Sequence, residues 1–142
     1  MCKLPLIQRV LGQKKYIFII ISLLIAINVH ADSKQTSQEL VGTWKQAPQS
    51  IGGSTSQCVT KFSQNGTYTE WIEKYPSGEM ELFITGIWKV KESMITFETL
   101  TSSLPYIEAP GDLSSYKIQQ LNNNRINLTN EYGYLRKLKK VE

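Results

Sequence analysis

The stretch that decides the fold is Leu40–Gln46, LVGTWKQ, where a polar segment ends and the first β-strand begins. Successive side chains of a strand point to opposite faces of a sheet, so Leu40, Gly42, Trp44 and Gln46 share one face. A glycine two residues before an indole fits a tight barrel end, where the backbone bends and a wide ring closes the bottom. The alternative is that Trp44 is simply a core aromatic residue, as in any small β-protein.

Upstream of this strand, the sequence predicts an export signal over residues 1–31 and a flexible polar leader over residues 32–39. The basic side chains of the first part are Lys3, Arg9, Lys14 and Lys15. An apolar run of about 14 residues, Tyr16–Val29, follows them, and Ala31 supplies a small residue for cleavage. A membrane span needs about 20 apolar residues, so we expect a periplasmic or secreted protein. An uncleaved membrane anchor is the alternative.

Cleavage after Ala31 changes the charge of the protein. The chain has 16 basic and 12 acidic side chains, and the leader holds four of the basic ones and none of the acidic ones. Residues 32–142 therefore carry 16 − 4 = 12 basic and 12 acidic side chains, which gives a net charge of zero. An argument for nucleic acid or anionic lipid from the overall basic charge does not apply to the mature chain.

The mature chain has few residues for catalysis or metal binding. The single histidine, His30, lies in the leader, which excludes Ser-His-Asp and Cys-His arrangements and histidine-ligated metals from residues 32–142. Cys58 is the one cysteine left, so it forms no internal disulfide and is predicted to be buried or available to a partner. We expect no cofactor and no metal.

Short segments of alternating or β-rich character, separated by turn signals, continue to the end of the chain, and none has a sustained helical period. Asn65-Gly66 is the strongest hairpin signal among the turns. The remaining strands are predicted at Gln57–Ser63, Thr67–Glu73, Met80–Val90, Met94–Leu100, Ser114–Leu121, Arg125–Thr129 and Tyr132–Lys140. Eight strands joined mostly by short turns predict an all-β fold, an up-and-down antiparallel β-barrel over residues 40–142.

Two segments interrupt the strands. Residues 47–56 are rich in Pro, Gly and Ser, and either cover the barrel mouth or serve as a linker. The longest irregular segment is Thr101–Leu113, where Leu104, Tyr106 and Ile107 are unusual choices for a solvent loop. They are predicted either to pack over an opening or to form a contact surface.

The chain resembles the small bacterial lipocalin-like domain proteins over nearly all of residues 40–141. The resemblance rests on Gly42-Thr43-Trp44, on Phe62 with Asn65-Gly66-Thr67-Tyr68, on Gly86-Ile87-Trp88-Lys89-Val90, and on Tyr134-Leu135-Arg136. In that family a basic side chain near the end of the barrel lies over the first-strand tryptophan. The resemblance therefore implies a barrel-closing contact between Trp44 and Arg136, worth roughly 0.5–2 kcal/mol.

The first functional hypothesis is a barrel that binds a small apolar or amphipathic ligand in its interior or at its mouth. The predicted lining is the set of inward-facing side chains Tyr68, Ile84, Trp88, Phe97, Tyr116 and Ile118. The same residues would be needed to fill the interior of a barrel of this size, so a mostly filled barrel is the alternative.

The second hypothesis is a periplasmic protein-binding or inhibitor module that uses the segment 101–113, with Phe83 and Ile87 adding apolar surface on an outer face. Catalysis ranks below both hypotheses. The acids Glu70, Glu98, Glu108 and Asp112 could supply a carboxylate pair, but their spacing in the sequence places no two of them together. We therefore expect a protein that is not an enzyme.

Overall fold

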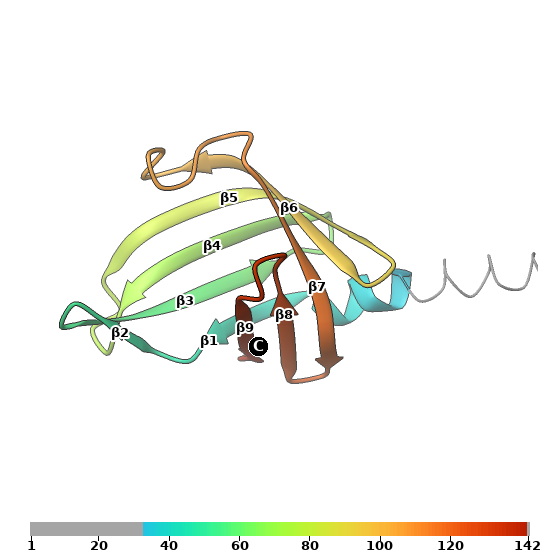
Figure 1. Cartoon of the computed structure of the whole chain (residues 1–142), viewed down its shortest axis with the longest axis horizontal. Coiled ribbons are helices and arrows are strands. Elements are labelled where there is room, and N and C mark those ends of the chain that lie inside the picture. The colour runs from blue at the N-terminus through green and yellow to red at the C-terminus, as the bar shows by residue number, and fades with distance from the viewer. Residues whose placement is uncertain (1–32, 142) are drawn as a thin grey trace, which may run out of the picture.

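The computed structural model describes residues 33–141, which form an antiparallel barrel with a short helix at one end (Figure 1). The helix covers residues 33–40. The strands are β1 Gly42–Gln46, β2 Gln49–Ile51, β3 Ser54–Phe62, β4 Thr67–Lys74, β5 Met80–Lys91, β6 Met94–Ser102, β7 Leu113–Asn122, β8 Arg125–Thr129 and β9 Leu135–Lys140. The predicted segment 1–31 lies outside the described residues. Within residues 33–141, no helix has the length and hydropathy that crossing a bilayer requires.

The sheet closes on itself, which confirms the predicted eight-stranded barrel. Its strands follow the order β1-β9-β8-β7-β6-β5-β4-β3-β2, and β1 also pairs with β3. The short strand β2 lies outside the closed ring and pairs only with the start of β3. Closure leaves few unpaired strand edges. Apart from the pairings β1–β9 and β1–β3, all neighbouring strands in the ring are consecutive in sequence.

Two segments differ from their predicted structure. Residues 47–56, expected to be a loop, contain β2 and the first residues of β3. The polar segment 33–40, expected to be a flexible leader, is a helix, with Ser37 Oγ donating to the Ser33 carbonyl (2.8 Å) and Gln35 Nε2 to Glu39 Oε1 (3.1 Å). The segment lacks an apolar period because it buries mainly its last residue, Leu40, which is 0% exposed.

The barrel floor lies where this helix meets β1 and β9. Trp44 is fully buried, and its Nε1 donates to the Leu40 carbonyl at 2.7 Å. Lys140 Nζ lies 5.0 Å from the centre of the Trp44 ring and donates to the Glu39 carbonyl at 3.3 Å. The last carbonyls of a helix lack partners within the helix, so both donors also cap its end.

The predicted contact between Trp44 and Arg136 is wrong. The register places Trp44 opposite Lys140, and Gln46 opposite Leu138. Arg136 shares the inward face of β9 but lies four residues before Lys140, roughly 13 Å away at ~3.3 Å per residue. The expected stacking of a cation on the indole is present, but Lys140 supplies the cation.

Large aromatic side chains fill the half of the barrel next to the helix. Phe62 lies 5.3 Å from Trp88 and 5.9 Å from Phe97, measured between ring centres. The Phe97 ring also meets Tyr68 at 5.1 Å and Tyr116 at 5.9 Å. In this half of the barrel the interior is filled by side chains, as the alternative to a ligand-binding interior predicted.

Gly86 marks the point where the long strand β5 changes register with β6. A Cβ atom at this position would lie 2.1 Å from the Glu98 carbonyl oxygen and 2.5 Å from the Tyr68 ring. No larger residue fits there, because one of the two close atoms belongs to the backbone.

A second irregularity lies in β7, between Ile118 and Gln120. Beyond it, Leu121 packs against the core, while Gln120 is exposed. Unbroken alternation along the predicted strand Ser114–Leu121 would place Gln120 on the inward face with Tyr116 and Ile118. An extra residue in one strand of a pair shifts every later side chain to the other face, which alternation cannot foresee.

Candidate functional site

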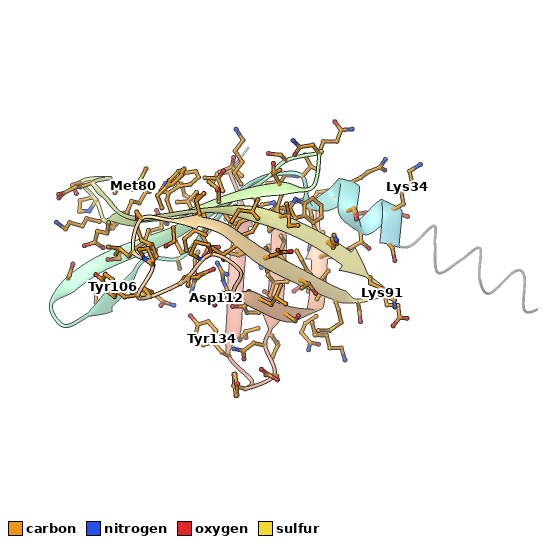
Figure 2. The ribbon with its side chains drawn as sticks, turned by 90° about the horizontal axis from the view of Figure 1, so that it is seen from above. Lys34, Met80, Lys91, Tyr106, Asp112 and Tyr134 are labelled. Carbon is orange, nitrogen blue, oxygen red and sulfur yellow. The ribbon has the colours of Figure 1, made fainter. Side chains whose placement is uncertain are left out.

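A chamber of about 280 Å³ remains in the barrel interior on the side away from the helix. Figure 2 shows Tyr106 and Asp112 on the loop that follows β6, and Lys34 on the helix at the other end of the barrel. The residues that line the chamber are Tyr68, Glu70, Phe97, Glu108, Asp112, Leu113, Ser114, Tyr116 and Arg136. The chamber combines an aromatic base, where Phe97 contacts both tyrosines, with a wall of charged side chains.

Three of the six predicted ligand-binding residues line this chamber, namely Tyr68, Phe97 and Tyr116. Ile84 and Trp88 are 2% and 6% exposed and belong to the packed core, so the prediction that they line the site is wrong. Trp88 Nε1 is also engaged, because it donates to the Thr67 carbonyl at 3.0 Å.

Ile118, the sixth predicted residue, lies elsewhere. It lines a separate hollow of about 310 Å³ between the helix and the β6–β7 side of the barrel, together with Gln35, Glu39 and Leu121. The register explains the separation, because Ile118 N bonds to Ser93 O near the helix end of the barrel, two residues along β7 from Tyr116.

Arg136 is the central charged group of the chamber. Its Nη2 donates to Glu70 Oε2 at 2.9 Å, with Cys58 Sγ at 3.3 Å and Thr60 Oγ1 at 3.4 Å. The guanidinium carbon lies 5.7 Å from the centre of the Tyr116 ring. Burial has the largest single effect on the pKa of Arg136 and lowers it, but Glu70, Cys58 and Tyr116 together outweigh burial. The pKa of Arg136 is therefore raised, and the side chain stays cationic.

Glu70 is held by two donors from different strands. Thr60 Oγ1 donates to Glu70 Oε2 at 2.7 Å, in addition to the bond from Arg136. The ion pair is mostly enclosed, since the side chains of Arg136 and Glu70 are 11% and 17% exposed. A buried pair of this kind fixes the position of both groups, because either charge alone would be costly to desolvate.

A second polar group lies across the chamber. The Tyr68 hydroxyl is 3.3 Å from Thr99 Oγ1, which in turn donates a short hydrogen bond to Glu108. Burial raises the pKa of Tyr68, so its phenol stays protonated at neutral pH. Asp112 accepts a bond from the Ala109 amide at 2.8 Å, which holds the loop in place around the chamber.

The chamber brings three of the four candidate acids together, although the sequence placed no two of them side by side. Glu70 comes from β4, while Glu108 and Asp112 come from the loop after β6. Glu98, the fourth acid, alternates with the inward-facing Phe97 and Thr99 and lies on the outer side of β6. No local sequence signal could have found this cluster, because it depends on where the loop returns to the barrel.

Cys58 lies beside the ion pair and is partly buried. Burial, and the nearby charge of Glu70, raise the pKa of its thiol to about 12, so the unreactive thiol is the form present at neutral pH. Cys58 was predicted to be either buried or available to a partner. This environment favours burial as a small apolar residue.

The loop after β6 has two kinds of apolar side chain. Leu104 packs against the core, as expected for a residue over an opening. Tyr106 and Ile107 are 82% and 60% exposed, as expected for a contact surface. Among the described residues, no group of three or more His, Cys, Asp or Glu side chains could hold a metal ion.

Solved structures with the same fold come from Bacteroides species. A lipocalin-like protein from Bacteroides uniformis is similar with a TM-score of 0.56 and 15% identity, over 72% of this chain and 98% of that chain. An uncharacterized protein from Bacteroides eggerthii is similar with a TM-score of 0.52 and 19% identity, over 71% of this chain and 98% of that chain. No protein-family model and no curated protein matches this sequence.

Sequence identities of 15% and 19% support a shared fold and nothing further. The closed ring of antiparallel strands, the first-strand tryptophan under a lysine and the similarity to these two structures agree with each other. In its fold, the chain is a lipocalin-like β-barrel.

Proposed function

We propose that this protein binds a small amphipathic molecule in the chamber at the mouth of the barrel, with an apolar ring against Phe97, Tyr68 and Tyr116 and a positively charged head group. The observation that carries the proposal is the composition of the chamber wall, which holds three carboxylates and one guanidinium. Arg136 neutralises Glu70, so Glu108 and Asp112 remain to attract a cation.

The shape of the chamber supports a small ligand over a long apolar one. Its volume of about 280 Å³ is near the lower end of ligand pockets, which are typically about 300–1,000 Å³. The aromatic cluster around Phe62 and Trp88 fills the barrel below it, so an acyl chain has no space to continue inward. A lipocalin-like fold is compatible with this function, but the chamber itself supplies the argument.

Tryptamine and indole-3-acetate test the proposal, because they share an aromatic body and differ in the sign of their charge. Isothermal titration calorimetry is expected to show saturable binding of tryptamine that is about tenfold tighter than binding of indole-3-acetate, since one ion pair in a partly enclosed site is worth ~1.4 kcal/mol. The variant Glu108→Gln/Asp112→Asn is expected to remove this preference.

The matched control is Glu79→Gln/Glu81→Gln, which removes the same net charge from exposed positions around the β4–β5 turn. It should leave the binding of tryptamine unchanged. The proposal fails if neither compound saturates, or if indole-3-acetate binds as tightly as tryptamine.

A second candidate function is favoured by the exposed apolar side chains of the loop after β6. Besides Tyr106 and Ile107, Leu113 is 71% exposed and Phe83 on β5 is 37% exposed. We propose, as the alternative, that this loop docks against a periplasmic protein. Replacing residues 105–107 with Gly-Ser-Gly should abolish capture of that partner from periplasmic extract, whereas unchanged capture argues against the loop.

We also propose that the protein is exported and is not an enzyme. Export is supported by the basic start of the sequence, the apolar run Tyr16–Val29 and the small residue Ala31. Binding without catalysis is supported by the state of the acids, because Glu70 is held in an ion pair and residues 32–142 have no histidine to act as a base at neutral pH.

A further inference from the structure

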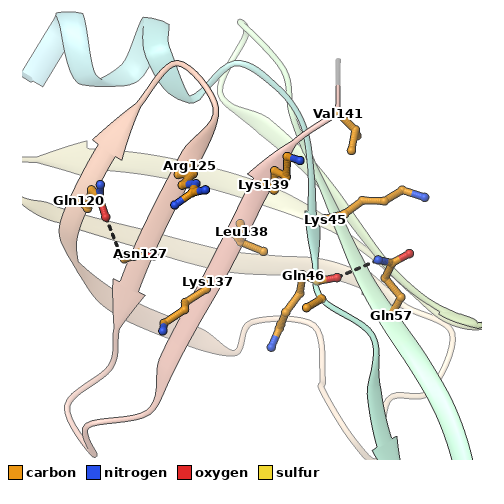
Figure 3. A pocket seen from close by; sticks show the side chains of 11 residues that line it. Lys45, Gln46, Gln57, Gln120, Arg125, Asn127, Lys137, Leu138, Lys139 and Val141 are labelled. Atoms are coloured by element: carbon orange, nitrogen blue, oxygen red, sulfur yellow. Dashed lines mark hydrogen bonds between the residues drawn. The ribbon is translucent and has the colours of Figure 1, made fainter.

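A hollow lies outside the barrel, on the outer face of β7, β8, β9 and β1 (Figure 3). Its volume is about 480 Å³. Four basic side chains line it, from three different strands, and these are Lys45, Arg125, Lys137 and Lys139. Among residues 33–141, no acidic side chain lines it. The net charge of zero over residues 32–142 therefore conceals a strongly positive face.

Three of these cations form a single row across the sheet. Arg125 on β8 is directly opposite Lys139 on β9, and Lys139 is directly opposite Lys45 on β1. Neighbouring strands lie about 4.8 Å apart, so the row spans roughly 10 Å. Like charges directly opposite each other destabilise a sheet, so this arrangement is unfavourable unless an anion lies over it.

An ion pair neutralises one end of the row, Lys45, and leaves the charges of Arg125 and Lys139 unpaired within residues 33–141. Lys45 Nζ is 3.1 Å from Glu73 Oε1, and the carboxylate is mostly buried on β4. Within residues 33–141, neither Arg125 nor Lys139 nor Lys137 has a carboxylate oxygen within 4 Å. A guanidinium and two ammonium groups therefore face solvent with their charges available.

Amide side chains and a small apolar floor complete the hollow. Asn127 Nδ2 donates to Gln120 Oε1 at 2.8 Å, which leaves the Gln120 amide nitrogen as a donor and the Asn127 oxygen as an acceptor. Figure 3 shows this pair beside Arg125 and Lys137. Ala47 and Val141 add apolar contacts at the other side of the hollow. Donors and acceptors of this kind suit hydroxyl groups, whereas the cations suit carboxylates or sulfates.

We propose that this outer hollow binds an acidic oligosaccharide, with its acidic groups along the row Arg125–Lys139–Lys45 and its hydroxyl groups against Gln120 and Asn127. A carbohydrate fits the combination of cations and amides better than a nucleic acid does, because no aromatic ring from residues 33–141 lines the hollow for a base to stack on. A flat membrane surface would contact the rim of the hollow and leave the amide pair unused. This site is separate from the chamber and takes a ligand of the opposite charge.

Binding of a heparin-derived tetrasaccharide to the full protein tests the proposal, with maltotetraose as the neutral carbohydrate of the same length. Calorimetry at physiological salt is expected to show saturable binding of the heparin tetrasaccharide and none of maltotetraose. The variant Arg125→Gln/Lys139→Gln should weaken binding at least about tenfold, because it removes two charge-assisted contacts. The control Lys89→Gln/Lys91→Gln removes the same charge from exposed positions of β5 and should leave the affinity unchanged.

Two further measurements distinguish binding at this site from non-specific attraction of an anion to a basic surface. Asn127→Ala should weaken binding of the heparin tetrasaccharide without a change in net charge, which a purely electrostatic surface would not show. The melting temperature of Arg125→Gln/Lys139→Gln should be equal to or above that of the wild type, because the substitution relieves repulsion between opposite residues.

The proposal is overturned if the heparin tetrasaccharide does not bind, or if both double variants lose affinity equally. It is also overturned if oligodeoxythymidylate or phosphatidylglycerol vesicles bind more tightly than the tetrasaccharide through Arg125 and Lys139. Binding of tryptamine in the chamber is measured independently, so failure of one site leaves the result for the other unaffected.

Discussion

Arg136 places a guanidinium inside the barrel, where only 11% of its side chain is exposed. Three neighbours hold it in position, because it donates to Glu70, Cys58 and Thr60 from β4 and β3. Its other face lies over Tyr116 of β7. One residue therefore joins three separated parts of the barrel wall, and the geometry of the chamber depends on it.

The energy of this ion pair can be measured by a double-mutant cycle. Glu70→Gln and Arg136→Met are each expected to lower the free energy of unfolding by about 2 kcal/mol, because each leaves the other charged or polar group enclosed without its partner. The double variant should cost at least about 1 kcal/mol less than the sum. Urea unfolding followed by tryptophan fluorescence gives the four free energies.

The exposed pair Lys74 and Glu79 provides the control. Its atoms are also 2.9 Å apart, but the side chains are 43% and 66% exposed, so the coupling measured with Lys74→Met and Glu79→Gln should be below about 0.5 kcal/mol. Equal coupling energies in the two cycles would show that burial does not strengthen the Arg136–Glu70 pair.

At the scale of an element, the helix over residues 33–40 closes the floor of the barrel. Its last carbonyls accept bonds from Trp44 and Lys140, and its final residue Leu40 is 0% exposed. Local propensity does not explain the helix, because a polar segment of this length is marginal in isolation. Docking of Leu40 against the barrel core is what stabilises it.

Leu40→Ala tests this role. The substitution is expected to lower the free energy of unfolding by about 3 kcal/mol, because it removes a fully buried side chain and leaves a cavity. Gln38→Ala, at an exposed position of the same helix, should cost less than about 0.5 kcal/mol. Both values come from urea unfolding, and a cost below about 1 kcal/mol for Leu40→Ala would mean that the helix does not hold the floor.

At the scale of the whole molecule, positive and negative side chains are separated although residues 32–142 have equal numbers of each. In the part of the chain that the structure describes, the chamber holds three acids, and the outer hollow holds four bases and no acid. A neutral protein can therefore present two surfaces of opposite charge, and net charge alone would have excluded the ligand proposed for the outer hollow.

The proposed export and cleavage can be tested by measuring the mass of the protein that reaches the periplasm. Expression of the full gene product in a Gram-negative host should release a periplasmic form that begins at Asp32, which intact mass spectrometry identifies directly. Replacing Ala31 with a bulky residue, as in Ala31→Leu, should reduce this cleavage. A membrane-bound product of full length would favour the alternative of an uncleaved anchor.

The sequence by itself determined the fold class, most strand positions and the inward face of most strands. Alternation of apolar and polar side chains is a local property, so Tyr68, Ile84, Trp88 and Phe97 could be assigned to the interior without knowledge of their partners. The segment Leu40–Gln46 left two interpretations of Trp44 open, a ring that closes the barrel floor and an ordinary core residue, and its burial agrees with both.

Only the tertiary structure decided which charged residues meet. The cation over Trp44, the three acids of the chamber and the row Arg125–Lys139–Lys45 all depend on the pairing of strands that are far apart in sequence. Register and bulges set that pairing, and a shift of two residues preserves the apolar pattern while it exchanges every charged neighbour. The apolar pattern therefore specifies the barrel, whereas strand register specifies its binding sites.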